Sequence, residues 1–391
     1  MHDVIIVGGG PVGSYLASKL AEAGERVLVL ERKSDIGERV CCTGIVSREC
    51  VQSFHIDEGL ILRWLNSASI FSPSGKLVRL RREEPQACVL DRRAFNRAMA
   101  ERAQQNGAEY RFGSQVKEIR CSEEEAWVSV VEKGEKLDFR ARVIVLATGF
   151  GSNLTKKLGL GKSVDFALGA QVEVEINSDE VEIYLGRKVA PGFFAWLVPT
   201  SSHKGLVGLL THRNPGFYLK GLISNLRREG KIVSVRSEVA RHGVTLKPLS
   251  RSYDRRLIVV GDAAGQVKPI TGGGIYYGLL SADIAADTLH QALKIDDLSS
   301  ENLAAYERRW KQRLGQELLI DRYAHLLYER LGDGGIDKLF SFLTSTGIAE
   351  ALLKAEDISF DWHAKAIVKA LKVGGWSLVT KPLRIKYNNV N

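Results

Sequence analysis

The sequence is poor in the features that define several large classes of protein. Its 391 residues include five cysteines, which form no C-x-x-C pair and no disulfide framework of a small secreted protein: Cys41, Cys42, Cys50, Cys88 and Cys121. We therefore expect reduced thiols. No apolar run approaches the roughly 18 residues of a membrane-spanning helix, and the first residues leave no room for a signal peptide. These absences favour a cytoplasmic protein.

Motifs of several enzyme classes are missing as well. The chain has neither the Gly-x-Ser-x-Gly turn of serine hydrolases nor the phosphate loop of nucleotide hydrolases. Its eight histidines are scattered without the spacing of metal ligands, so we expect no metal site. The formal net charge of +9 favours phosphates or acidic lipid surfaces as partners. Nucleic acid is not expected, because the basic residues are dispersed and no nucleic-acid motif occurs.

A glycine-rich turn organises the N-terminal part of the chain. The apolar residues 3–7 have the pattern of a buried parallel strand, and a helical pattern starts at the glycines that follow. Gly8 and Gly10 permit a tight turn close to a phosphate, and Gly13 lets the helix pack against the strand. The N-terminus of such a helix offers N–H groups to a pyrophosphate.

A second apolar run, residues 26–30, ends at Glu31. An acidic residue at this strand end suits hydrogen bonds from ribose hydroxyls and disfavours a 2′-phosphate. Strand, glycines, helix, strand and acid in this order predict a site for an adenine dinucleotide.

A strand-Gly-Asp element far along the chain favours FAD over NAD. A nicotinamide domain is usually complete within about 150 residues, whereas Gly261 and Asp262 follow a strand only at residues 256–260. Asp262 would accept hydrogen bonds from ribityl hydroxyls, and a helix opening at Gly272–Gly274 would point at the flavin. The alternative is that Asp262 only caps a helix and the glycines only form a turn.

The order of these patterns predicts an α/β fold in which one domain is interrupted by another. We expect a discontinuous FAD-binding doubly wound (Rossmann-like) domain at residues 1–65, 88–165 and 247–300. Alternating apolar and polar residues predict an inserted antiparallel-sheet substrate domain with one solvated or cavity-facing side, at residues 66–87 and 166–246. Residues 301–391 are expected to form a helical C-terminal region.

These residues together resemble the geranylgeranyl reductase family of FAD-dependent oxidoreductases, within the larger group similar to para-hydroxybenzoate hydroxylase. The resemblance extends to about residue 290 and is most specific at Pro269-Ile270-Thr271-Gly272-Gly273-Gly274-Ile275, then at residues 192–199. Where the family usually reads Gly-Tyr-x-Trp-x-Phe-Pro-Lys, this chain keeps Trp196 and Pro199. It carries other residues at three positions, Phe194, Val198 and Thr200, and one extra residue after Gly192.

The resemblance implies reduction of carbon–carbon double bonds in an isoprenoid chain by hydride from reduced FAD, with NADPH, NADH or ferredoxin as electron donor. It implies that the FAD is lined by Gly13, Glu31, Cys42, Thr43, Arg92, Val116, Asp262, Gly274 and Ile275. Val116 and Thr43 would act through backbone atoms. Arg92 either bridges to FAD or is a solvated residue in the first turn of a helix.

Two interpretations of the substrate side stay open. Cys42 either supplies the proton that an isolated alkene needs beside the hydride or is a small packing residue. Cys41 is the weaker candidate, because only one of two neighbours can face the flavin. Phe193, Phe194 and Trp196 either line a tunnel for a prenyl chain or belong to the core of a sheet. Period-two alternation places Phe194 and Trp196 on one face.

Residues 362–373 have the pattern of a basic amphipathic helix, which suits either docking on an anionic membrane or packing on the protein itself.

Two rival functions use the same flavin motifs. One is an FAD-dependent monooxygenase or halogenase that acts on an aromatic substrate. The other is an electron-transfer flavoprotein that acts on a quinone, although such a protein usually carries a cysteine-ligated cluster.

Overall fold

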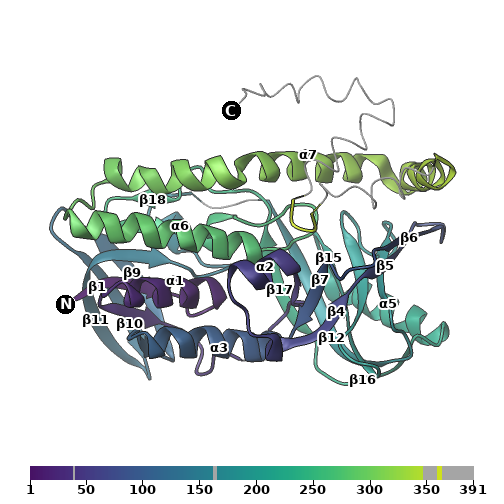
Figure 1. The fold of residues 1–391 in the computed structure, drawn as a ribbon, viewed down its shortest axis with the longest axis horizontal. Coiled ribbons are helices and arrows are strands. Elements are labelled where there is room, and N and C mark those ends of the chain that lie inside the picture. The colour runs from purple at the N-terminus through teal and green to yellow at the C-terminus, as the bar shows by residue number, and fades with distance from the viewer. Residues whose placement is uncertain (38–39, 162–164, 347–358, 363–391) are drawn as a thin grey trace.

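The computed structural model describes residues 1–37, 40–161, 165–346 and 359–362, and it arranges them around two large sheets (Figure 1). The first sheet has the order β18-β19-β11-β1-β2-β8, and β9 and β10 join it through β11. Its strands are β1 (His2–Val7), β2 (Val27–Leu30), β8 (Glu109–Arg111), β9 (Ser114–Cys121), β10 (Ala126–Glu132), β11 (Glu135–Leu146), β18 (Tyr253–Asp254) and β19 (Leu257–Val259).

The centre of this sheet is parallel and buried on both faces. β1 pairs in parallel with β2 and β11, and β11 pairs in parallel with β19. Val4 and Ile6 pack with the helices α1 (Pro11–Glu22), α3 (Arg92–Gln105) and α6 (Ile275–Lys294) on one face. Ile5 and Val7 pack on the other face, with residues of the antiparallel β9–β10–β11 meander. Burial on both faces explains why these strands are continuous apolar runs.

The second sheet has the order β16-β12-β15-β14-β13-β5-β6, with β17 also paired to β12. It is antiparallel except for the parallel pair β13–β5. α5 (Pro215–Arg228) packs on one of its faces. Its strands are β5 (Ser67–Phe71), β6 (Leu77–Arg81), β12 (Phe166–Ile176), β13 (Val181–Leu185), β14 (Phe194–Pro199), β15 (Lys204–Thr211), β16 (Ile232–Val235) and β17 (Ala240–Thr245).

A small sheet and a few short helices complete the region between the two large sheets. The small sheet has the order β3-β7-β4. Its strands are β3 (Ile45–Ser47), β4 (Ile61–Leu65) and β7 (Ala87–Leu90), and the short helical elements are α2 (Arg48–Ser53), η1 (Glu58–Leu60), α4 (Leu154–Lys157) and η2 (Gly261–Ala264).

The long helix α7 (Ser300–Thr346) runs past both large sheets (Figure 1). Its first half packs on α6 through Tyr306 and Trp310. The helix is kinked at Gly332, where φ is 59° and the backbone is not helical. Beyond the kink, Ile336 and Phe340 pack against residues of the second sheet. α7 therefore connects the two sheets along one side of the molecule.

The predicted fold class is confirmed: a doubly wound parallel sheet, an antiparallel sheet and a C-terminal helix are all present. The exact domain limits stay a prediction. The predicted basic helix at residues 362–373 lies outside the described residues apart from Trp362, and its membrane docking and the cytoplasmic location also stay predictions. Within the described ranges, no helix is both long and apolar enough to cross a bilayer.

The contact between the start of α1 and the turn after β1 generates a prediction about stability. A Cβ at Gly13 would lie 2.0 Å from the carbonyl oxygen of Gly8, so backbone has to move. We expect Gly13→Ala to lower the free energy of unfolding by about 1–3 kcal/mol, as overpacking does. Urea unfolding of the FAD-free protein measures this change.

Gly221→Ala on α5 is the matched control, since nothing lies within 4 Å of its added Cβ. This control should leave stability unchanged or raise it by about 0.4–1 kcal/mol. Equal stability of the Gly13→Ala variant and the unchanged protein would show that the close approach is unimportant.

Candidate functional site: a cavity shared by the two sheets

A cavity of about 1210 Å³ lies where the strand ends of the first sheet meet the second sheet. The residues at or just after the carboxyl ends of β1, β2 and β11 line it, namely Val7, Leu30 and Ala147. Ligands of open α/β sheets bind at this end of the strands. Residues of β5, β13, β14 and β17 line the opposite side of the same cavity.

The first glycine turn has the geometry of a dinucleotide cradle. Gly8 lines the cavity with φ of 110°, and a Cβ on it would lie 2.4 Å from the carbonyl oxygen of Ala147. Gly10 also lines the cavity and occupies the N-cap position of α1. It has no side chain to bond to the first backbone N–H groups of the helix. Gly13 lies behind the turn, against Gly8. The N-terminus of α1 can therefore approach a phosphate, while Gly13 provides the helix packing.

Glu31 lies at the end of β2 and faces the cavity. It is 8% exposed, and its carboxylate accepts hydrogen bonds from the backbone N–H of Gly9 at 2.8 Å and of Lys33 at 2.9 Å. These bonds hold the carboxylate beside the glycine turn, where it can accept from ribose hydroxyls.

The second glycine segment borders the same cavity from the other side. Gly274 is the N-cap of α6, and no side chain caps this helix in the described part of the chain. A Cβ on Gly274 would lie 2.7 Å from Oδ1 of Asp262, which is on η2. Burial raises the pKa of the Asp262 carboxyl. Asp262, Gly274 and Ile275 all line the cavity, so the structure brings both predicted glycine segments to one space.

Unpartnered donors support a bound acceptor in this space. Arg92 lines the cavity, and its Nε and Nη1 atoms are buried without a hydrogen-bond partner among the described residues. The hydroxyl of Thr148, which follows β11, is also buried without a hydrogen-bond partner among the described residues. Buried donors without partners are costly, and a phosphate or a flavin carbonyl would satisfy them. Thr43 and Val116 line the cavity too. The residues present therefore fit FAD.

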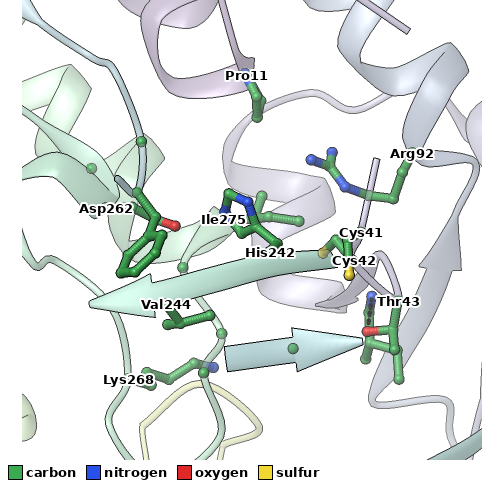
Figure 2. A pocket seen from close by; sticks show the side chains of 18 of the residues that line it. Pro11, Cys41, Cys42, Thr43, Arg92, His242, Val244, Asp262, Lys268 and Ile275 are labelled. Atoms are coloured by element: carbon green, nitrogen blue, oxygen red, sulfur yellow. Dashed lines mark hydrogen bonds between the residues drawn. The ribbon is translucent and has the colours of Figure 1, made fainter. Parts of the chain in front are cut away.

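Cys41, Cys42 and His242 all line the cavity, and Figure 2 draws His242 beside the two cysteines. The Cys41 thiol donates to the carbonyl oxygen of Ala240 at 3.4 Å, and burial raises its pKa to about 12. The Cys42 sulfur accepts from the backbone N–H of Gly44 at 3.4 Å. His242, on β17, lies between these cysteines and Asp262 in Figure 2, and burial lowers the pKa of its imidazole.

The aromatic residues line the cavity on the side of the second sheet. Phe194 and Trp196 of β14 have ring centroids 5.9 Å apart. Their neighbours on the strand, Ala195 and Leu197, point into the core on the opposite face. Phe193 precedes the strand and is 1% exposed, so it is both a core residue and part of the cavity wall.

Most of the remaining wall is aliphatic, although Ser67 of β5 and Arg81 of β6 also line the cavity. Alternate residues of β13 line the cavity, whereas Glu182 and Tyr184 between them bond to Lys231. The aliphatic residues that line the cavity on this side include Leu65, Ala68, Ile70, Leu80, Val181, Ile183, Leu185, Val198, Leu210 and Val244. A wall built mainly of such residues suits a hydrocarbon chain.

Gln171 links this wall to the cysteine loop and was not predicted from the sequence. Its amide oxygen accepts from the Trp196 indole at 3.3 Å, and its amide nitrogen donates to the carbonyl oxygen of Cys42 at 3.3 Å. Gly208 makes room for the indole, because a Cβ there would lie 2.5 Å from it. His242 was also missed. Both residues are positioned by strand pairing, so local sequence gave no signal for them.

A buried ion pair beside the second glycine segment was missed as well. The Lys268 ammonium lies 2.5 Å from the Asp361 carboxylate, and both side chains line the cavity. Tyr277 donates to the backbone carbonyl of Asp361 at 2.9 Å. Segment 359–362 therefore closes part of the cavity next to Gly273.

Comparisons with known proteins agree with this geometry. The family model described as an FAD binding domain matches residues 1–318. A digeranylgeranylglycerophospholipid reductase of Methanosarcina acetivorans is 30% identical, over 97% of this chain and 95% of that protein. One of Methanocella arvoryzae is 31% identical, over 81% of this chain and 84% of that protein.

Solved structures of two other proteins have a similar fold. A geranylgeranyl bacteriochlorophyll reductase-like protein of Thermoplasma acidophilum has a TM-score of 0.85 and 26% identity, covering 98% of both chains. A flavin-dependent halogenase has a TM-score of 0.70 at 16% identity, covering 98% of this chain and 78% of its own. This second likeness shows the fold alone.

The fold, the glycine cradle and the matched family model define an FAD-dependent oxidoreductase. Within that class, the chain belongs to the geranylgeranyl reductase family. The predicted family is confirmed. The roles of the individual site residues stay predictions.

Arg92 generates a test of the cofactor site. We expect Arg92→Ala to weaken FAD binding by about 2 kcal/mol or more, a loss of at least roughly thirtyfold, because a buried acceptor on the cofactor loses its charged donor. Titration of the FAD-free protein, followed by quenching of flavin fluorescence, measures the dissociation constant.

Arg93→Ala is the matched control, because Arg93 is exposed and its guanidinium bonds to Glu173 on the surface, at 3.4 Å. It should bind FAD like the unchanged protein. Equal affinities for the two variants would remove Arg92 from the cofactor site.

Proposed function

We propose that this protein uses FAD to reduce carbon–carbon double bonds in the isoprenoid chain of a prenyl lipid. The observation that carries the proposal is the continuity of one cavity, whose polar side is the dinucleotide cradle and whose other side is the apolar wall of the second sheet. The relatives named as digeranylgeranylglycerophospholipid reductases support a geranylgeranyl lipid as the substrate class.

The chain's own groups would hold the cofactor in a defined orientation. Bound FAD, once reduced, supplies a hydride to the substrate. Gly8, Gly10 and Glu31 would hold the adenosine and pyrophosphate end. The N-terminus of α6 at Gly274 would place positive helix-dipole charge near the other end, which favours a reduced, negatively charged ring.

The apolar wall would bind the prenyl chain and exclude water. Phe194 and Trp196 belong to this wall, and Trp196 is linked to the cysteine loop through Gln171. Since the same cavity reaches from Asp262 to Val181, a chain bound along the second sheet would place a double bond beside the flavin.

The reaction also requires a proton at the second alkene carbon. Cys42 lines the cavity and would donate this proton directly or through a water molecule. Cys41 is a weaker candidate because its thiol already donates to the Ala240 carbonyl and its pKa is raised to about 12 by burial. NADPH, NADH or ferredoxin would return electrons to the flavin.

Anaerobic incubation of the dithionite-reduced, FAD-loaded protein with geranylgeranyl lipids tests the function. The expected result is reoxidation of the flavin together with a product heavier by two hydrogens for each reduced double bond. The proposal fails if the flavin stays reduced with every prenyl lipid but reoxidises with oxygen and hydroxylates an aromatic compound, which is the reaction of a monooxygenase.

Replacement of Cys42 tests the proton donor. We expect Cys42→Ala to leave FAD bound and to lower lipid turnover by about 10²–10⁴-fold, the usual contribution of a general acid. Turnover is measured by product mass, and FAD content by visible absorbance of the purified protein.

The control is Cys121→Ala, because Cys121 lies on β9, outside the cavity lining. Its turnover should be unchanged. Unchanged turnover of Cys42→Ala would remove Cys42 from the mechanism, and a loss in Cys41→Ala instead would assign the proton to its neighbour.

A further inference from the structure

A cluster of two histidines and a glutamate lies where α7 passes the end of β15. His212 directly follows β15, and Glu329 is 117 residues further along the chain, on α7. His325 precedes Glu329 by one helical turn, so both side chains lie on one face of the helix. His212 Nε2 bonds to Glu329 Oε1, and one ligand atom from each of the three residues lies within 4.8 Å of the others.

His325 is held in place with one ring nitrogen unsatisfied. Its side chain is 7% exposed, and its ring stacks on Phe193 with a centroid distance of 4.5 Å. His325 Nε2 is buried without a hydrogen-bond partner among the described residues, and Glu329 Oε1 at 3.8 Å is too far for such a bond. A buried nitrogen of this kind is costly and indicates a missing partner in the cluster.

The loop before β14, which contains Gly192, leaves room for the side chains of the cluster. A Cβ on Gly192, whose φ is 82°, would lie 2.7 Å from His212 Cδ2 and 3.0 Å from Glu329 Oε1. Only a residue without a side chain at this position allows His212 and Glu329 to meet. This packing requirement is independent of the unsatisfied nitrogen of His325.

We propose that His212, His325 and Glu329 form a binding site for Zn²⁺. Two imidazole nitrogens and one carboxylate oxygen are a common zinc donor set, and they leave a fourth, tetrahedral position for water. Tetrahedral ligand atoms lie about 3.4 Å apart at the usual bond lengths. Metal binding would therefore separate the hydrogen-bonded His212 and Glu329 atoms and bring His325 Nε2 closer to Glu329 Oε1, from 3.8 Å at present. The nitrogen donors favour Zn²⁺ over Mg²⁺, which prefers oxygen ligands.

The site would join α7 to the second sheet. His212 follows β15, the loop at Gly192 leads into β14, and the other two ligands belong to α7. Since His325 and Phe193 line the cavity, the metal would also fix the part of α7 that borders it. The proposed role is to hold α7 against the second sheet, and it requires no redox change of the metal.

The test measures metal binding by the FAD-loaded, full-length protein after dialysis against a chelator. One equivalent of Zn²⁺ should bind, as measured by elemental analysis, and Mg²⁺ should not compete. Co²⁺ as the probe should give the visible absorption of a tetrahedral nitrogen and oxygen site. Zn²⁺ should raise the melting temperature, because it binds the folded state.

Two variants distinguish the proposed site from others on the surface. His212→Ala and Glu329→Gln should each weaken Zn²⁺ binding by more than about a hundredfold, since loss of an outer-shell partner alone costs about 10–100-fold. Glu329→Gln keeps the shape of the side chain, and His212 is half-exposed, so both variants should fold and retain FAD. His203→Ala, at an exposed histidine in the β14–β15 turn, is the control and should bind normally.

The proposal is overturned if the unchanged protein binds less than one equivalent of Zn²⁺. It is equally overturned if the His212→Ala and Glu329→Gln proteins bind Zn²⁺ and gain thermal stability like the His203→Ala protein. Either result leaves the proposed reductase function untouched, because FAD content and lipid turnover are measured separately.

Discussion

The close approach of α1 to the turn after β1 is the constraint on which the cofactor site depends. Gly13 lies against the carbonyl of Gly8, and Gly8 in turn lies against the carbonyl that follows β11. No side chain larger than hydrogen fits at either position, so the helix starts at the strand ends and its N-terminus faces the cavity. The second glycine segment has the same constraint: Gly274 lies against the Asp262 carboxylate at the start of α6, and a side chain there would collide with it.

The two sheets act as one site because contacts across the cavity fix their relative position. A Cβ on Gly272, in the loop before α6, would lie 2.7 Å from Leu210 of the second sheet. Gln171 connects the same sheet to the backbone of the cysteine loop. A cofactor held by the first sheet is therefore placed at a defined position relative to the apolar wall of the second, which is what transfer to a hydrocarbon chain requires.

Local patterns predicted the features that depend on neighbouring residues. The glycine turn and Glu31 lie where strand and helix periodicity placed them, Arg92 lies in the first turn of a helix, and alternation assigned Phe194 and Trp196 to one face. Features made by long-range pairing could not be predicted this way. Gln171 contacts the cysteine loop, and His242 lines the cavity, because β12 pairs with β15 and β17. His212 and Glu329 are 117 positions apart in the sequence, so no local spacing rule predicts their contact.

The measurement that tests the account most directly is an experimental structure of the protein with FAD and a geranylgeranyl lipid bound. We expect a single FAD that spans residues 8–13 and 272–274, with the lipid chain along β13 and β14 and a double bond beside the flavin ring. Two separate ligands at the two glycine segments, or a lipid chain bound away from the second sheet, would contradict it.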